Sequence, residues 1–314
     1  MTETPLTPTE VGEHLAEVLP AAPGERLQHR RGACAVGVFH PDPAAATLST
    51  AALFAEPAPV RLRFSGTRGG TDGHDAYTGD QGLSVRFTPA DGPPSDLITF
   101  TLPVFFVRTG ADMFDFITAS SPEPATGQPN PAALAEFRRR HPESAAALAA
   151  ATDRAPASYL GQQYYAIHAF GLTNAAGHIT WARLEWHPTA TLPSLDPHEA
   201  GKLPPDYLTT DLARRLPATM TLYARLPAAG DPLHDPTALW ADPPQLVRLG
   251  ELRLETPTDD EDLDFDPLRL PPGITPPRDQ LAADRSTVYR VVRTNRHRAL
   301  ERLQNRARPS KASG

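Results

Sequence analysis

Short runs in which apolar and polar residues alternate are the feature that most limits the folds open to this chain. They form two sequential groups, and glycine, aspartate and threonine are concentrated in the turns between the runs. The first group covers residues 59–65, 82–88 and 97–107, and the second covers 163–172, 178–187, 220–226 and 246–254. Because each such strand buries one face, the pattern predicts an antiparallel barrel or sheet with helical additions.

Helical patterns lie before, between and after the two strand groups. Residues 5–20 form an amphipathic pattern that either Thr7 or Thr9 could cap, and Glu10 lies three residues after Thr7. Further helices are expected at 111–119, in the alanine-rich stretch 131–152, which ends at 138–142 and then resumes, and in the basic stretch 278–306. We therefore expect an α+β fold.

A single domain covering residues 1–314 accommodates all these segments. Its expected parts are a helical arm at 1–24, a barrel with a helical insertion at 25–255, a proline-rich wrapping segment at 256–278, a last helix at 279–306, and a tail at 307–314.

Composition narrows the class of protein. A net charge of −7 argues against a nucleic-acid binder. The single cysteine, Cys34, excludes internal disulfides and cysteine-clustered metal sites, which fits a reducing cytosol. The first residues carry neither the basic nor the apolar region of an export signal, and no stretch approaches the roughly 18–20 continuous apolar residues of a membrane span. We therefore expect a cytoplasmic protein.

The last helix pattern carries a chemical signal. Arg285 and Tyr289 are four residues apart, so they share one helical face, and Arg293 and Arg296 continue it. A fixed positive charge beside a phenol favours the phenolate anion, and tyrosinate is one of the known protein ligands of haem iron. Without further support, such a pair is more often part of a solvated helix face.

Several motifs in collinear order resemble the haem catalases and their shorter catalase-related peroxidases. The C-terminal one joins the proline-rich segment 270–276 to Asp279, Arg285 and Tyr289 with the family's spacing. The N-terminal one, residues 25–35, is similar to the family's distal-histidine segment. Between them, residues 60–65, 103–108 and 159–170 resemble three further family segments. The resemblance covers roughly residues 20–300, and it implies the catalase β-barrel with 279–306 as the proximal ligand helix.

On the proximal side, the resemblance makes Tyr289 the iron ligand. Arg285 would then hydrogen-bond the ligand oxygen, and His168 and Asp279 would complete a chain that fixes the guanidinium. The implied cofactor is haem b, iron protoporphyrin IX. His168 taken alone would more often be a structural histidine.

On the distal side, the resemblance makes His29 the acid–base group and Ser65 the residue that orients it. His29 would take a proton from bound peroxide and return it to the leaving oxygen. Arg26, Arg63 and Arg296 match positions that pair with haem propionates, where guanidinium–carboxylate contacts are favourable.

Four departures from the family pattern bear on function. Phe100, followed by Thr101, stands where catalases have an asparagine beside the peroxide, and losing such a polar partner costs about 1–3 kcal/mol. Gln28 replaces a valine before the distal histidine, and Met113 replaces a phenylalanine expected to stack near the haem. The chain also ends soon after the ligand helix, without the family's long C-terminal portion. We expect poor disproportionation of hydrogen peroxide and a pocket shaped for an organic molecule.

Three functions remain in competition. The first is a catalase-related peroxidase that uses peroxide to oxidise a small organic substrate. The second is a haem tailoring enzyme of secondary metabolism that rearranges a hydroperoxide or inserts oxygen. The third is a non-catalytic haem-binding barrel, against which His29, Arg285 and Tyr289 argue. The first is favoured, with peroxide and an organic molecule as partners, no nucleic acid, no membrane span, and a homo-oligomer left open.

Overall fold

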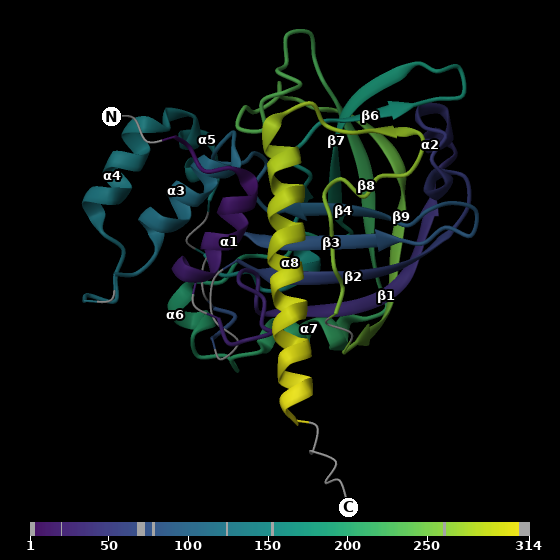
Figure 1. Cartoon of the computed structure of the whole chain (residues 1–314). Helices are drawn as coiled ribbons and strands as arrows, with labels where there is room; N and C mark the ends of the chain where they lie inside the picture. The colour runs from purple at the N-terminus through teal and green to yellow at the C-terminus, as the bar shows by residue number, and fades with distance from the viewer. Residues whose placement is uncertain are drawn as a thin grey trace, which may run out of the picture.

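The computed structural model describes residues 4–19, 21–67, 73–76, 79–123, 125–151, 154–259 and 262–307 (Figure 1). Its centre is a closed antiparallel barrel in which β7, β5, β4, β3, β2, β1, β9 and β8 follow one another around the ring, and β7 closes it by pairing with β8. Two short strands, β6 and β10, extend the sheet beyond β7. The expected α+β barrel is therefore confirmed.

The strands of the sheet have the following bounds. They are β1 Gly32–Pro41, β2 Ala58–Gly66, β3 Gln81–Phe87, β4 Ser95–Phe100, β5 Tyr164–Tyr165, β6 Phe170–Thr173, β7 Ile179–Pro188, β8 Ala218–Leu226, β9 Gln245–Thr258 and β10 Ile274–Thr275. The helices are α1 Pro8–Val18, α2 Pro43–Leu48, α3 Gly110–Ser120, α4 Pro131–Arg140, α5 Ala145–Ala150, α6 Pro197–Ala200, α7 Tyr207–Arg215 and α8 Gln280–Ala307.

Alternation along the strands separates an apolar core from a polar outer face. On β2, Val60, Leu62 and Phe64 enter the core inside the barrel. Arg63 and Ser65 alternate with them and therefore lie on the outer face. Since successive side chains of a strand point to opposite faces, the same strands can fill the core and carry a polar site outside it.

Helix α8 lies along the outer side of the barrel with α1 beside it (Figure 1). Of the two caps expected for α1, Thr7 is the one used: its hydroxyl accepts from the Glu10 amide at 3.3 Å, and the Glu10 carboxylate accepts from the Thr7 amide at 2.8 Å. The two helices approach closely at Gly12, where an added Cβ would lie 2.8 Å from the Cβ of Val291.

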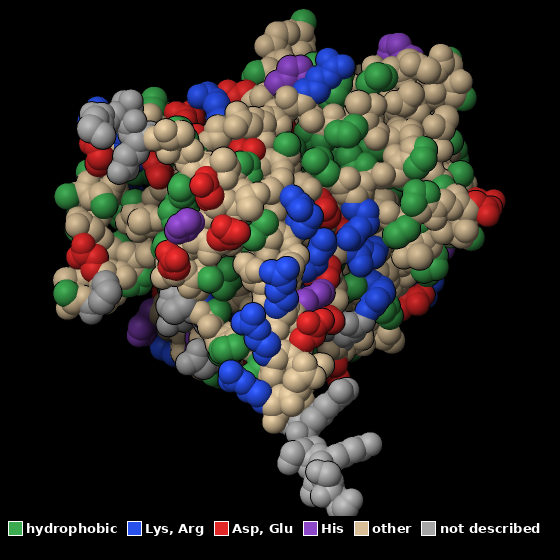
Figure 2. Space-filling view, viewed as in Figure 1, with side chains coloured by type: hydrophobic (Ala, Val, Ile, Leu, Met, Phe, Trp, Pro, Cys, Tyr) green, Lys and Arg blue, Asp and Glu red, His purple; other side chains and the backbone are tan. Residues whose placement is uncertain are grey.

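The exposed side of α8 is basic, as its sequence predicts. Lys and Arg side chains follow the helix on the face shown in Figure 2. Arg290, Arg298 and Arg302 are exposed. Among the described residues, no helix combines the length and the apolar character needed to cross a membrane.

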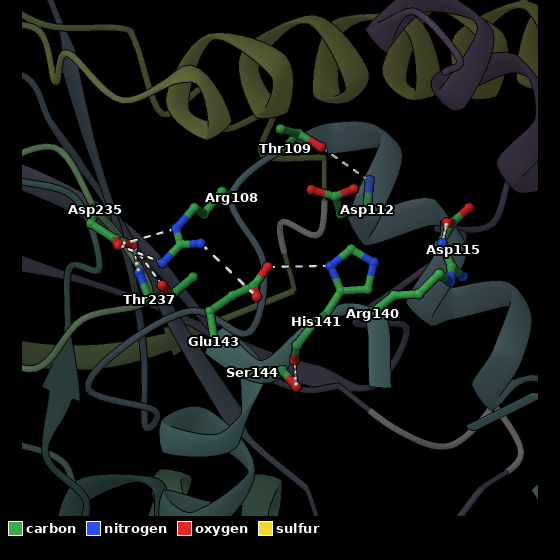
Figure 3. Close-up of polar contacts among 10 residues, drawn as sticks. All are labelled: Arg108, Thr109, Asp112, Asp115, Arg140, His141, Glu143, Ser144, Asp235 and Thr237. Atoms are coloured by element: carbon green, nitrogen blue, oxygen red, sulfur yellow. Dashed lines mark hydrogen bonds and ion pairs between the residues drawn. The ribbon is translucent and has the colours of Figure 1, made fainter. Parts of the chain in front are cut away.

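An ion-pair cluster ties the helical insertion to the barrel (Figure 3). Arg108 precedes α3 and donates to the Asp235 carboxylate, in the segment between β8 and β9, at 2.8 and 3.1 Å. Its other amino group lies 3.9 Å from the Glu143 carboxylate, which contacts the His141 ring at 3.2 Å. Arg108 therefore fixes the segment between Phe100 and α3 through two contacts, one with Asp235 and one with Glu143.

Several expected elements differ from the structure. The strand expected at 97–107 ends at Phe100, because Pro103 has no amide hydrogen to continue the ladder. By contrast, the interruption expected at His141 and Pro142 within 131–152 is confirmed, since α4 ends at Arg140 and α5 begins at Ala145. The strand expected at 163–172 is interrupted between β5 and β6, where the His168 ring bonds groups outside the barrel. The wrapping segment 256–278 begins inside β9 and contains β10.

The proposed subdivision of the chain stays a prediction. Residues 1–3 and 20 of its helical arm, and 308–314 of its tail, lie outside the described residues.

Candidate functional site

A buried chain of polar groups begins on α8 and runs into the segment before β6. The Arg285 guanidinium donates to the Tyr289 phenol at 3.4 Å and to Nε2 of His168 at 2.8 Å. Nδ1 of His168 lies 3.0 Å from the Asp279 carboxylate. Arg285, His168 and Asp279 are all less than a tenth exposed. The sequence brought the same four residues together through the family resemblance.

The direction of these hydrogen bonds fixes the state of His168. A guanidinium can only donate, so Nε2 of the imidazole must accept, and Nδ1 carries the proton that is donated to Asp279. Burial lowers the pKa of His168, which agrees with a neutral ring. Burial alone would raise the pKa of Asp279, but the hydrogen bonds from His168 and from the Ala282 amide hold it below its usual value. His168 and Asp279 therefore hold the Arg285 cation in place beside the Tyr289 oxygen.

His29 faces this chain from the other side, on the segment before β1. Its Nδ1 lies 3.0 Å from the Ser65 hydroxyl, which β2 positions on its outer face. The backbone of His29 has a φ of 51°, in the left-handed region, and the buried Arg63 donates to its carbonyl oxygen at 2.9 Å. Gly82 on β3 leaves room for this pair, since an added Cβ would lie 3.0 Å from the Ser65 hydroxyl oxygen.

The charge state of His29 follows from its surroundings. Burial, and then the positive charges of Arg63, Arg285 and Arg26, lowers the pKa of His29 to about 3. The ring is therefore neutral near pH 7, and one of its nitrogens is free to accept a proton.

Three arginines expected to bind carboxylates lie around the same region. Arg63 is 4% exposed and also donates to the Arg30 carbonyl at 3.0 Å. Arg26 donates to the Leu263 carbonyl, and Arg296 donates to the Gly24 carbonyl, both at 2.9 Å. Nη1 of Arg296 is buried and makes no hydrogen bond among the described residues, although it lies 3.5 Å from the Asp262 carboxylate. A ligand carboxylate would satisfy it.

Phe100 lies between the two sides of the site. Its ring centre is 5.8 Å from that of His29 and 5.2 Å from the Arg285 guanidinium carbon. The ring is 6% exposed and belongs to an apolar cluster with Leu263, against which Tyr289 packs. An apolar ring therefore lies beside both His29 and Arg285, and its replacement of a family amide stays a prediction.

Two expected residues stand apart from this group, and one was not expected. Gln28 precedes His29, but its side chain is exposed. Met113 is buried in the apolar cluster between α1, α3 and α8. Phe105 is the residue that was not expected, and its ring lies 5.5 Å from the Arg285 guanidinium carbon. Its place in the motif 103–108 was visible, but the segment was expected to be a strand.

The residues present fit an iron porphyrin. A phenol held beside a guanidinium provides an oxygen ligand for the iron, and an unsatisfied arginine nitrogen fits a propionate. Aromatic and aliphatic side chains such as Phe100, Phe105 and Leu263 provide the apolar contacts that a porphyrin ring needs.

Comparison with known proteins agrees with this geometry. The model of the family described as Catalase matches residues 9–305. The chain is 30% identical over 307 residues to a catalase-related peroxidase of Synechococcus elongatus, covering 95% of this chain and 91% of that protein. It is 30% identical over 295 residues to one of Mycolicibacterium paratuberculosis, covering 90% and 93%.

Longer proteins match over part of their length. A catalase of Pseudomonas syringae is 29% identical over 288 residues, which cover 84% of this chain and 56% of the catalase. Among solved structures, a bacterial catalase superposes with a TM-score of 0.79 at 22% identity, covering 97% of this chain and 63% of that one. At this identity the superposition shows the fold alone.

Proposed function

The chain belongs to the catalase family, and we propose that it is a haem peroxidase that uses hydrogen peroxide to oxidise a small organic molecule and evolves oxygen only slowly. The coarser part of this description, a haem-dependent oxidoreductase of peroxidase or catalase type, follows from the family and from the two catalase-related peroxidases to which the chain is similar along most of its length. The finer part is the proposal.

The proposed cofactor is haem b, with Tyr289 as its iron ligand. When bound, the haem would supply the redox chemistry. Arg285, held by His168 and Asp279, would keep positive charge beside the Tyr289 oxygen. Arg26, Arg63 and Arg296 would bind the propionates, which fits the unsatisfied nitrogen of Arg296.

His29 is the proposed proton carrier. Its pKa of about 3 keeps the ring neutral near pH 7, so the ring can accept a proton from peroxide. The same low pKa makes protonated His29 a strong acid, which readily returns that proton to the leaving oxygen. Ser65 would orient the ring through its hydrogen bond to Nδ1.

One observation carries the choice of a peroxidase over a true catalase. Phe100 places an apolar ring 5.8 Å from the His29 ring, where a side-chain amide would hold hydrogen peroxide. A phenyl ring cannot take part in a conventional hydrogen bond, but it can line a pocket for an organic molecule. The same observation favours the second candidate, rearrangement of an organic hydroperoxide.

The test compares two activities of the haem-loaded protein. We expect hydrogen peroxide to drive guaiacol oxidation, while oxygen evolution stays far below the rate of a true catalase measured alongside. Oxygen evolution at catalase-like rates would reject the peroxidase proposal. Consumption of an organic hydroperoxide without guaiacol oxidation would favour the rearrangement instead.

A further inference from the structure

A cavity of about 220 Å³ lies one residue further along the strands that carry the site. Phe100 on β4 pairs with Gly82 on β3, and the residues that follow and precede them, Thr101 and Gln81, line the cavity. Leu102, Pro156 and Tyr165 contribute apolar walls. The volume lies below the roughly 300–1,000 Å³ typical of sites for drug-sized ligands, so it fits a molecule smaller than those.

Gln81 gives this cavity a specific hydrogen-bond acceptor. The side chain is 4% exposed, and its amide nitrogen donates to the Gly79 carbonyl at 3.3 Å. The backbone amide of Gln81 donates to the Thr101 hydroxyl at 3.0 Å, which fixes the residue in place. The other end of the side chain, Oε1, is buried and has no partner in the part of the chain that the structure describes. Because a buried acceptor without a partner is costly, a ligand with an O–H or N–H group would be favoured here.

The charges around the cavity favour a neutral ligand. Arg154 and Asp80 both line it and carry opposite charges. The Arg154 guanidinium donates to the Ser194 carbonyl at 2.9 Å. With one charge of each sign at the wall, selection is left to the apolar side chains and to the neutral polar ones, which are Gln81, Thr101, Gln162, Gln163 and Ser194.

We propose that this cavity binds the organic substrate and that the substrate is a small phenol whose hydroxyl group donates to Oε1 of Gln81. This inference rests on the proposed peroxidase function. In the reaction, two phenols each give up one electron and the proton of their O–H group. The O–O bond of one hydrogen peroxide breaks, and it takes up both electrons and both protons to form two waters, leaving two phenoxyl radicals. The group that is recognised is therefore also the group that is oxidised.

The first experiment measures how much the hydroxyl group of the ligand contributes to binding. Guaiacol and its methyl ether veratrole share a ring, but only guaiacol has an O–H group. Ligand-observed NMR titrations of the haem-loaded protein should show tighter binding of guaiacol. Gln81→Met keeps the length of the side chain and removes the acceptor, so it should raise the Kd of guaiacol roughly three- to tenfold and leave that of veratrole unchanged.

The second experiment fills the cavity. Ala151 lines it at the end of α5 and is exposed, so Ala151→Phe should weaken binding of both ligands by more than about tenfold through steric exclusion. Ala149→Phe adds the same ring at an exposed position of α5 outside the lining and serves as the matched control. Ala149→Phe should react with hydrogen peroxide alone at the wild-type rate.

The two proposals fail in different ways. An unchanged Kd for guaiacol in both Gln81→Met and Ala151→Phe would overturn the cavity as the phenol site, whatever the activity. Wild-type protein that binds guaiacol with the expected sensitivity to both variants, but does not oxidise it, would support the site and reject the peroxidase function.

Discussion

Replacing Phe100 by asparagine tests how the pocket sets the balance between oxygen evolution and organic oxidation. The change removes a buried ring that lies 5.8 Å from His29 and 5.2 Å from the Arg285 guanidinium carbon. It supplies an amide that can donate to hydrogen peroxide. A good polar partner contributes about 1–3 kcal/mol, so we expect oxygen evolution, as kcat/KM for hydrogen peroxide, to rise roughly five- to hundredfold.

The same change has a cost in stability. Truncating a buried phenylalanine costs about 3–5 kcal/mol, and the lost contact with the Arg285 cation contributes to this loss. Urea denaturation of the haem-loaded protein should show a lower free energy of unfolding. Phe100→Leu is the matched control, because it also loses the ring and the cation contact but gains no donor. Its oxygen evolution should stay at the wild-type level.

The assay is oxygen evolution and guaiacol oxidation measured on the same preparations with equal haem content. A rise in oxygen evolution in both Phe100→Asn and Phe100→Leu would refute the hydrogen-bond argument, because pocket size alone would then explain the result. If the wild type already evolves oxygen rapidly and Thr101→Val abolishes this, Thr101 supplies the donor and the interpretation of Phe100 is wrong.

Three further results are expected from the site. Tyr289→Phe should lose most of its haem and its high-spin, five-coordinate visible spectrum; wild-type haem content and Soret band would contradict the ligand assignment. His29→Ala should retain haem but react with peroxide about 10²-fold more slowly in stopped-flow measurements, and an unchanged rate would reject its role. Because the pKa of His29 falls from 6.5 to about 3 on folding, only the unfolded state binds this proton between these values. Stability should therefore fall with pH from about 6.5 toward 3, by up to roughly 1.4 kcal/mol per unit, and His29→Ala should flatten this slope in urea titrations at several pH values.

The barrel was predictable because strands such as β3 and β8 alternate between core and outer face along most of their length. β1 was harder to single out, since it begins Gly32, Ala33, Cys34, Ala35, residues with little intrinsic strand preference. Helix α7 was missed, although Tyr207, Leu208 and Leu212 give it a buried stripe. Cys34 is a free, buried cysteine.

Only part of the site could be predicted from the spacing of residues within a single element. The spacing of Arg285 and Tyr289 is a property of one helix, and the structure confirms that they share a face. The contacts of Arg285 with His168 and Phe105 join segments more than a hundred residues apart, and periodicity cannot reveal such contacts. The roles of Gln28 and Met113, the cytoplasmic location and the assembly state stay predictions.

The packing of α8 against α1 and the barrel has a consequence for how the protein is made. On the ribosome, His29 and then every barrel strand are synthesised before Tyr289. The residue proposed to bind iron is therefore made after every strand of the barrel that supports its site. Binding of the haem iron by Tyr289 would then require α8 to pack in its final position. The close approach of Val291 on α8 to Gly12 on α1 would hold the two helices together there.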